Sequence, residues 1–176
     1  MNNIDIKKIV ENLIETFLYA GKISIELRNQ GLTKEIKSDN TPVSNGDLEV
    51  NKIITKKIVS LTPDILIISE ETSENKSKNN LENFWLIDPI DGTYDYINDL
   101  EEFTINAGLI INKKPVAGLI YAPAKERMFY SYGKDNAYEI INGKHLKLDC
   151  SKNFDKNNIK FVSYSNNIKP EIKKIH

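Results

Sequence analysis

The chain has 176 residues, of which 40% are hydrophobic and 28% are charged, so it is long enough for one domain with a real core. Its formal net charge of −1 gives no basic field that would attract nucleic acid or an anionic membrane surface. Cys150 has no partner for an internal disulfide, and no apolar run has the length of a signal-peptide core or a membrane span, so we expect a cytoplasmic protein without a transmembrane segment.

The first part of the chain favours two helices. Apolar residues at three- and four-residue steps predict an amphipathic helix over about residues 4–28, with Gly31 as its C-terminal cap. A polar, turn-rich loop is expected at residues 37–43, where the simplest interpretation of Lys37 is a solvated lysine. Ser44 then predicts the N-cap of a second helix, with Asp47 three residues later as in a capping box. The spacing alone leaves Asp47 open between capping and a role in an active site.

Two short apolar runs predict buried strands with acidic residues close behind them. Residues 64–69 form the first run, which ends in Glu70 and Glu71. Residues 84–87 form the second run, which has the pattern of a strand covered on both faces and which Pro89 is expected to end. Acidic residues at the carboxyl end of a strand lie where open α/β sheets place their ligand sites. The competing interpretation, a solvated loop glutamate, is stronger for Glu71 than for Glu70.

The turn after the second run carries the most chemistry. We expect Asp91 to be an N-cap, with Gly92 and Thr93 opening a helix whose free N–H groups attract anions such as phosphate. Asp88 and Asp91 bring two carboxylates to the same turn, and like charges held together are costly unless a cation lies between them. Magnesium would neutralise both carboxylates and bridge to a phosphate. The simpler alternative is a turn in which the aspartates only cap a helix.

The remainder of the chain favours an antiparallel sheet. After a short helical piece at residues 94–98, strands are expected at residues 103–111, 115–121, 128–132, 137–141 and 159–163. Residues 112–114 and the Asn142–Gly143 pair give turn signals between neighbouring strands. A helix starts near residue 169, and His145 stands alone, so we assign it no metal role. With its helices early and its strands late, the chain is predicted to be α+β rather than a regular βαβ alternation.

The candidate site therefore consists of acidic side chains and one hydroxyl group, from Asp47, Glu70, Asp88, Asp91 and Thr93. Several carboxylates without a suitable cysteine or histidine favour a hard metal such as magnesium over zinc. A helix start that faces these carboxylates favours a phosphorylated substrate. The sequence contains no P-loop motif, which disfavours a nucleotide-hydrolysing P-loop enzyme.

Three ordered motifs carry a family resemblance: Lys37-x-Asp39-x-Thr41-Pro42-Val43-Ser44, Ser69-Glu70-Glu71 and Trp85-Leu86-Ile87-Asp88-Pro89-Ile90-Asp91-Gly92-Thr93. Together they resemble the inositol monophosphatase superfamily of magnesium-dependent, lithium-sensitive phosphatases, over nearly the whole chain. Residues 101–106 and 118–123 further resemble its CysQ-type branch, the 3'(2'),5'-bisphosphate nucleotidases of sulfur metabolism. Members of this branch convert adenosine 3',5'-bisphosphate to AMP. The resemblance implies a layered α/β sandwich of the sugar-phosphatase type.

The resemblance also implies a metal site of two or three magnesium ions. Glu70, Asp88 and the carbonyl group of Ile90 would hold the first ion. Asp88 and Asp91 would hold the second ion. A metal at such a position lowers the pKa of bound water, and a pair of metals clamps the attacking and leaving oxygens in line.

The same resemblance implies roles for the residues around the metals. Glu70 and Thr93 would orient the attacking water, with Asp47 hydrogen-bonded to Thr93 behind it. The backbone amides of Gly92 and Thr93 would grip the phosphate of a small-molecule phosphomonoester, to which Ile90, Asp91 and Glu70 would also lie close. Lys37 would add positive charge.

Two departures from the family pattern are local. Asn45-Gly46 replaces the usual residue-plus-alanine before Asp47, and Ser44 stands where threonine is more frequent. A larger departure concerns the second half of the family fold, where members carry a further α/β domain. A Trp-Asp motif in that domain supplies an aspartate to the second metal site, and much of the surface for the substrate lies there. We therefore expect residues 1–150 to form the metal-binding domain and residues 151–176 to open an incomplete C-terminal domain.

Three hypotheses about function stay open at this point. The first is an active phosphatase for a bisphosphate nucleotide, with inositol phosphate as the alternative substrate. The second is a truncated chain that is inactive without a complementing C-terminal fragment. The third is a non-enzymatic protein that binds magnesium or a phosphate ligand. A homodimer is compatible with each of them.

Overall fold

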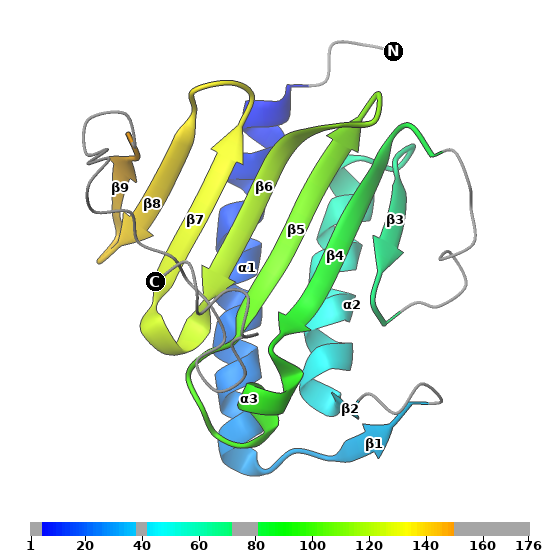
Figure 1. The fold of residues 1–176 in the computed structure, drawn as a ribbon, viewed down its shortest axis with the longest axis vertical. Helices are drawn as coiled ribbons and strands as arrows, with labels where there is room; N and C mark the ends of the chain where they lie inside the picture. The colour runs from blue at the N-terminus through cyan, green and yellow to red at the C-terminus, as the bar shows by residue number, and fades with distance from the viewer. Residues whose placement is uncertain (1–4, 38–41, 72–80, 150–176) are drawn as a thin grey trace, which may run out of the picture.

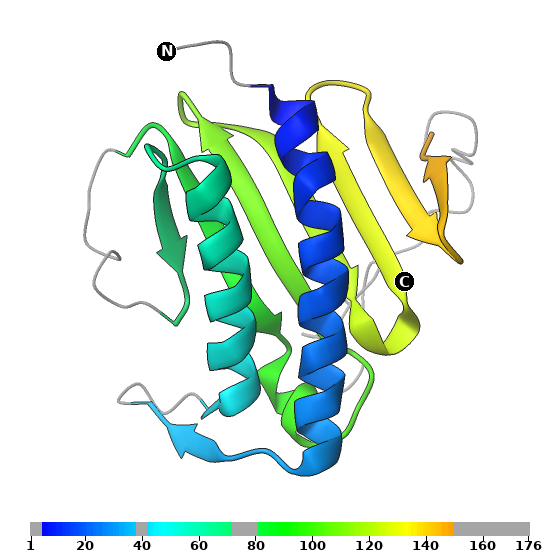
Figure 2. The same cartoon turned by 180° about the vertical axis from the view of Figure 1, so that it is seen from behind.

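The computed structural model describes residues 5–37, 42–71 and 81–149. Within these residues, two long helices lie side by side on one face of a seven-stranded mixed sheet (Figures 1 and 2). The predicted α+β class, with helices early and strands late, is confirmed. The strand expected at residues 159–163, the helix start near residue 169 and the whole of the expected segment 151–176 lie outside the described residues.

The two long helices cover the core. α1 spans Ile6–Gln30 and α2 spans Asn45–Leu61. The Asp5 carboxylate accepts a hydrogen bond from the Lys8 amide at 3.0 Å where α1 begins, and Gly31 ends this helix as predicted. The buried face of α1 is the one that the apolar spacing predicts, and it includes Val10, Leu13, Phe17 and Ala20. Among the described helices, none combines the length and the apolar character needed to cross a membrane.

The loop predicted at residues 37–43 is partly wrong. β1, Lys34–Ile36, pairs in antiparallel fashion with β2, Pro42–Ser44, so residues 42 and 43 belong to a strand. The pairing places Glu35 opposite Val43, whose β-branched side chain is 8% exposed. Lys37 follows β1 directly, and residues 38–41 lie outside the described part of the chain.

The main sheet runs in the order β3-β4-β5-β6-β7-β8-β9, in which only β3 and β4 are parallel neighbours. Its strands are β3 Leu66–Ser69, β4 Phe84–Asp91, β5 Thr104–Ile111, β6 Lys114–Ala122, β7 Arg127–Tyr132, β8 Ala137–Ile141 and β9 Lys144–Lys147. The predicted strands over the described residues and the turns at residues 112–113 and 142–143 are confirmed. The sequence did not predict β9, because this exposed edge strand has no buried apolar face.

The core lies between the sheet and the two helices. Alternate residues of the central strands point toward α1 and α2. Trp85 is one of them; it is 0% exposed, and its indole N–H group donates a hydrogen bond to the Thr62 hydroxyl at 3.1 Å. On the other face, Leu86 is 52% exposed and Ile120 is 47% exposed. The expectation that the strand at residues 84–87 is covered on both faces is therefore wrong within the described residues.

Candidate active site

β4 carries two aspartates to one face of the sheet because its ladder is irregular near its end. Asp88 pairs with Asn106, and Asp91 pairs with Thr104, so three steps along β4 match two steps along β5. In a regular strand, residues three positions apart point to opposite faces. The extra residue of this bulge returns Asp91 to the face of Asp88. Pro89 lies inside the bulge, where its missing N–H group is tolerated, so the predicted end of the strand at Pro89 is wrong.

The chain turns sharply after β4. Gly92 has a φ of 93°, and a Cβ atom there would lie 2.7 Å from the carbonyl oxygen of Glu102, so only glycine fits. α3, Thr93–Ile97, begins at the next residue, with Gly92 rather than Asp91 as its N-cap. The expected N-cap role of Asp91 is wrong, because Asp91 still belongs to β4 and its carboxylate accepts a hydrogen bond from the Asn106 amide at 3.1 Å.

Glu70 joins the two aspartates from the neighbouring parallel strand. The Ser69 position pairs with Ile87, and the Glu70 amide donates to the Ile87 carbonyl oxygen at 3.1 Å, so Glu70 follows β3 at the level of Asp88. The negative charges of Glu70 and Asp91 both act on the Asp88 carboxylate, which places the three side chains in one region of the structure. These three acidic residues of the candidate site are therefore neighbours around the end of β4.

The environment of Asp88 disfavours its ionised form. Partial burial and the charges of Glu70 and Asp91 raise the pKa of Asp88 to about 7. The Oδ1 atom of Asp88 is also buried without a hydrogen-bond partner among the described residues. A bound cation would relieve the repulsion between the carboxylates and give this oxygen a partner.

Asp47 lies behind these carboxylates, in the first turn of α2. Its Oδ2 atom accepts hydrogen bonds from the Ser44 amide at 2.8 Å and the Ser44 hydroxyl at 2.6 Å, which confirms the predicted capping box. Its Oδ1 atom lies 3.3 Å from the Thr93 hydroxyl oxygen, which also lies 3.0 Å from the Ile90 carbonyl oxygen as an alternative acceptor. The pKa of Asp47 is raised overall, because the effect of burial exceeds that of the hydrogen bonds from Ser44 and Thr93, which lower the pKa. Asp47 thus caps α2 and also contacts Thr93, and its role in an active site stays a prediction.

Lys37 and Glu71 form an ion pair beside this cluster. The Lys37 Nζ atom lies 2.9 Å from Glu71 and 3.7 Å from Glu70. The Glu71 side chain is only 5% exposed, so its interpretation as a solvated loop residue is wrong. Burial alone would lower the pKa of Lys37, but the hydrogen bond to Glu71 and the charges of Glu71 and Glu70 raise it. Lys37 therefore stays charged, and it is not the freely solvated lysine of the simplest interpretation.

The donor set fits an oxygen-liganded cation, although it does not enclose one. Within the described ranges, no group of three or more acidic, histidine or cysteine side chains is placed so that it could hold a metal ion. Magnesium commonly binds through one or two carboxylates and completes its shell with water and phosphate oxygens. His145, on β9, instead has its Nδ1 atom 2.8 Å from the hydroxyl oxygen of Tyr130. A partial set of carboxylates is therefore compatible with magnesium and offers little to zinc.

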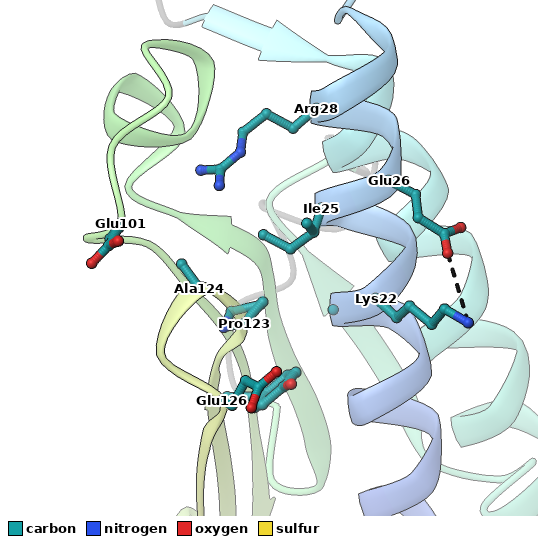
Figure 3. Close-up of a pocket in the computed structure, with 10 residues that line it drawn as sticks. Lys22, Ile25, Glu26, Arg28, Glu101, Pro123, Ala124 and Glu126 are labelled. Atoms are coloured by element: carbon teal, nitrogen blue, oxygen red, sulfur yellow. Dashed lines mark ion pairs between the residues drawn. The ribbon is translucent and has the colours of Figure 1, made fainter.

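A separate pocket of about 530 Å³ lies between α1 and the 3₁₀ turn Pro123–Lys125 (Figure 3). Apolar atoms of Ile25 and Ala124 face it, while Lys22 and Glu26 of α1 pair with each other at 3.7 Å. None of the candidate site residues lines this pocket. The carboxylate cluster and this pocket are therefore distinct features of the surface.

Comparison with known proteins gives the family. A model of the inositol monophosphatase family matches residues 5–175. The chain belongs to the inositol monophosphatase family. It is 35% identical over 142 residues to the 3'(2'),5'-bisphosphate nucleotidase CysQ of Aggregatibacter actinomycetemcomitans. The matched region covers 80% of this chain and 53% of that relative. The chain thus spans about half the length of the curated relatives it matches.

Solved structures of this family share the fold. The extragenic suppressor protein suhB of Bartonella henselae is similar with a TM-score of 0.67 and 22% identity, over 78% of this chain and 53% of that one. CysQ of Bacteroides thetaiotaomicron, described as a bacterial member of the inositol monophosphatase family, is similar with a TM-score of 0.59 and 25% identity, over 78% of this chain and 51% of that one. This chain therefore shares its fold with about half the length of those structures.

Proposed function

We propose that this chain carries the metal-binding and water-orienting residues of a magnesium-dependent phosphomonoesterase. The proposed reaction removes the 3'-phosphate of adenosine 3',5'-bisphosphate and gives AMP and inorganic phosphate. The observation that carries the proposal is the grouping of Glu70, Asp88 and Asp91 next to the Asp47–Thr93 contact. The substrate class follows from the CysQ relatives, which are named bisphosphate nucleotidases. A cytoplasmic location would suit this substrate.

The acidic residues would hold the metal. Glu70, Asp88 and the Ile90 carbonyl group would bind one magnesium ion, and Asp88 and Asp91 would bind another. The family resemblance implies two or three ions and sensitivity to lithium. Magnesium bound there supplies Lewis acidity toward water and toward the phosphoryl oxygens. The Oδ1 atom of Asp88 supports this assignment, because it has no hydrogen-bond partner within the described residues and a cation would be one.

Thr93 and Glu70 would orient the attacking water. The Thr93 hydroxyl has one proton, which it directs to Asp47 or to the Ile90 carbonyl oxygen. Its lone pairs are therefore left to accept a hydrogen bond from water. Glu70, which is 41% exposed, offers a carboxylate oxygen for the second water proton. Water held between the two residues would present an oxygen lone pair to phosphorus, and Glu70 would take the proton as the new P–O bond forms.

The phosphate would lie at the start of α3. In the described part of the chain no side chain caps this helix at Gly92, so the amides of Gly92 and Thr93 would be available to phosphate oxygens. Lys37 keeps its charge through the pair with Glu71 and adds positive potential next to Glu70. The ester P–O bond breaks as the 3'-oxygen leaves, and a proton from solvent completes the product alcohol.

The test is phosphate release by the purified chain in magnesium, with adenosine 3',5'-bisphosphate and inositol 1-phosphate compared. We expect release from the nucleotide, and Asp88→Asn should lower it by orders of magnitude. Asp64→Asn is the matched control, because Asp64 is an exposed aspartate at the start of the β3 region. Release from inositol 1-phosphate alone would favour the alternative substrate.

The chain's length relative to its relatives suggests a second experiment. The chain spans about half the length of its curated relatives, so turnover should be measured with and without a separately expressed second half of a CysQ relative. If no phosphate is released with or without the added fragment, the phosphatase proposal is contradicted. Magnesium binding that Asp88→Asn abolishes, without any turnover, would instead support the non-enzymatic binding protein.

A further inference from the structure

Tyr96 anchors the short helix that follows the candidate catalytic turn. It lies three residues after Thr93 in α3, so the two side chains share a face of the helix. The Tyr96 side chain is 0% exposed, and its hydroxyl donates to the Ser24 carbonyl oxygen of α1 at 2.7 Å. Its ring centroid is 4.9 Å from that of Phe103. These contacts fix α3 to the first helix of the chain.

Arg28 strengthens the same attachment. It extends from α1 toward the loop that carries Glu101 (Figure 3), and its Nη1 atom donates to the Leu100 carbonyl oxygen at 2.8 Å. Its guanidinium carbon lies 5.3 Å from the ring centroid of Phe103 and 6.0 Å from that of Tyr96. The Tyr96 ring is therefore held between α1 and the loop after α3 and has little freedom to move.

Tyr96 also fills the space beside Gly46, which directly precedes Asp47 in α2. A Cβ atom at Gly46 would overlap the Tyr96 hydroxyl oxygen and would lie 2.6 Å from Cε1 and 2.8 Å from Cζ of the ring. Glycine is less favourable than alanine inside a helix, and the backbone of Gly46 does not require a positive φ. The requirement for glycine at this position is therefore one of space, and Tyr96 creates it.

The Gly46–Tyr96 contact stands next to the hydrogen bond that orients Thr93. Asp47 and Thr93 belong to α2 and α3, and their oxygen atoms are 3.3 Å apart, which leaves little slack before the bond is lost. A methyl group at position 46 would push the first turn of α2 away from α3. The closeness of these two backbones thus depends on a glycine and a tyrosine that fit one another.

We propose that Gly46 and Tyr96 form a matched pair that sets the Asp47–Thr93 hydrogen bond, with Tyr96 as a positioning residue. The role in catalysis rests on the proposed phosphatase function, whereas the positioning of Thr93 does not. Neither residue touches the carboxylate cluster in this proposal. Their effect reaches the reaction through the orientation of one hydroxyl group.

The test compares the wild type, Gly46→Ala, Tyr96→Phe and the double variant. Gly46→Ala should shift the NMR signals of the Thr93 amide and methyl group, which a Thr93→Val variant identifies, and should lower kcat by roughly 10- to 100-fold with KM little changed. Tyr96→Phe removes the tether to Ser24, so the ring can yield to the new methyl group. The double variant should therefore recover most of the Thr93 signal position and most of the activity.

A Thr93→Val background separates positioning from general loss of stability. Without the hydroxyl, adding Gly46→Ala should cost no further activity, although it should still lower the melting temperature. Independent effects of the two substitutions at positions 46 and 96, or an unchanged Thr93 signal in Gly46→Ala, would overturn the proposal. If the wild-type chain releases no phosphate, but the Thr93 NMR signals shift in Gly46→Ala and recover in the double variant, the proposed function is overturned and the matched pair is supported.

Discussion

Asp88 illustrates, at the scale of single residues, how the candidate site conflicts with stability. Its carboxyl group carries the repulsion of Glu70 and Asp91, and one of its oxygens is buried without a donor among the described residues. A protein selected for stability alone would place an uncharged side chain there. Strongly perturbed acids of this kind are concentrated at functional sites. The cost is understandable if a cation removes it during function.

The raised pKa of Asp88 fixes the sign of a pH prediction. Because its folded-state pKa of about 7 exceeds the ordinary value of 3.8, ionisation of Asp88 opposes folding. The penalty is absent below about pH 4, grows as the pH rises and is complete above about pH 7; allowing for solvent screening, we expect about 1–2 kcal/mol. In a metal chelator at pH 8, Asp88→Asn should therefore melt at a higher temperature than the wild type, and this advantage should shrink toward pH 4.

Magnesium should reverse that order. The wild type should gain stability with magnesium concentration, since the ion binds the folded state, whereas Asp88→Asn should gain little. Asp64→Asn should behave like the wild type in both conditions. Equal or lower stability of Asp88→Asn in chelator at pH 8 would show that the carboxylates do not repel one another in solution.

The Lys37–Glu71 pair gives a second prediction at this scale. Lys37→Met removes the cation and leaves a nearly buried glutamate without its charge partner, which should cost about 1–3 kcal/mol of unfolding free energy. Glu71→Gln in the same chain should restore part of the loss, because it removes the unpaired charge. Urea unfolding of the two single variants and the double variant measures the coupling. Additive losses would mean that the pair is open to solvent.

At the scale of elements, the first turn of α2 combines helix capping with the site. Ser44→Ala removes a hydroxyl that donates to Asp47 at 2.6 Å, and we expect a loss of about 1 kcal/mol of unfolding free energy. Phosphate release should fall as well, because Asp47 loses one of the groups that hold it toward Thr93. Ser44→Thr keeps the hydroxyl and is the matched control. Unchanged activity in Ser44→Ala would separate capping from catalysis.

The elements also show what the sequence could and could not predict. Apolar periodicity identified α1 and the central strands, and the Ser44–Asp47 spacing identified the start of α2. The end of the strand predicted at Pro89 was wrong. Proline ends a strand only where the ladder needs an N–H donor at its position, and the bulge in β4 needs none there. The partnership of Asp91 with Asn106 depends on the pairing of β4 with β5, a long-range contact that no local pattern reveals.

The same limit applies to Glu71. Its burial depends on Lys37, which lies 34 positions earlier in the chain. A sequence of two adjacent glutamates after a strand is typical of a solvated loop, and local propensity gives no reason to separate them. The sequence did predict acidic residues around the end of β4, because their types and order carry the information, and their roles stay predictions. Their mutual geometry came only from the fold.

At the scale of the whole molecule, the sheet has one covered face and, among the described residues, one open face. Leu119 and Ile120 are neighbours in β6, but Leu119 is 0% exposed beneath the helices and Ile120 is 47% exposed on the open face. Leu119→Ala should cost about 2–5 kcal/mol of unfolding free energy, whereas Ile120→Ala should cost less than about 1 kcal/mol. Urea unfolding of the two variants measures both values. Similar costs would indicate that something covers the second face in solution.

The bulge in β4 has a consequence for how sequences of this kind can vary. Asp88 and Asp91 stand an odd number of positions apart, and a regular pleat would send such a pair to opposite sides. The extra residue of the bulge is what brings both aspartates to one face. The number of residues between the two aspartates therefore matters more than the identity of those intervening residues. Exchanging a side chain inside the interval leaves the parity intact, whereas inserting one residue while the bulge persists would reverse it and separate the two acids.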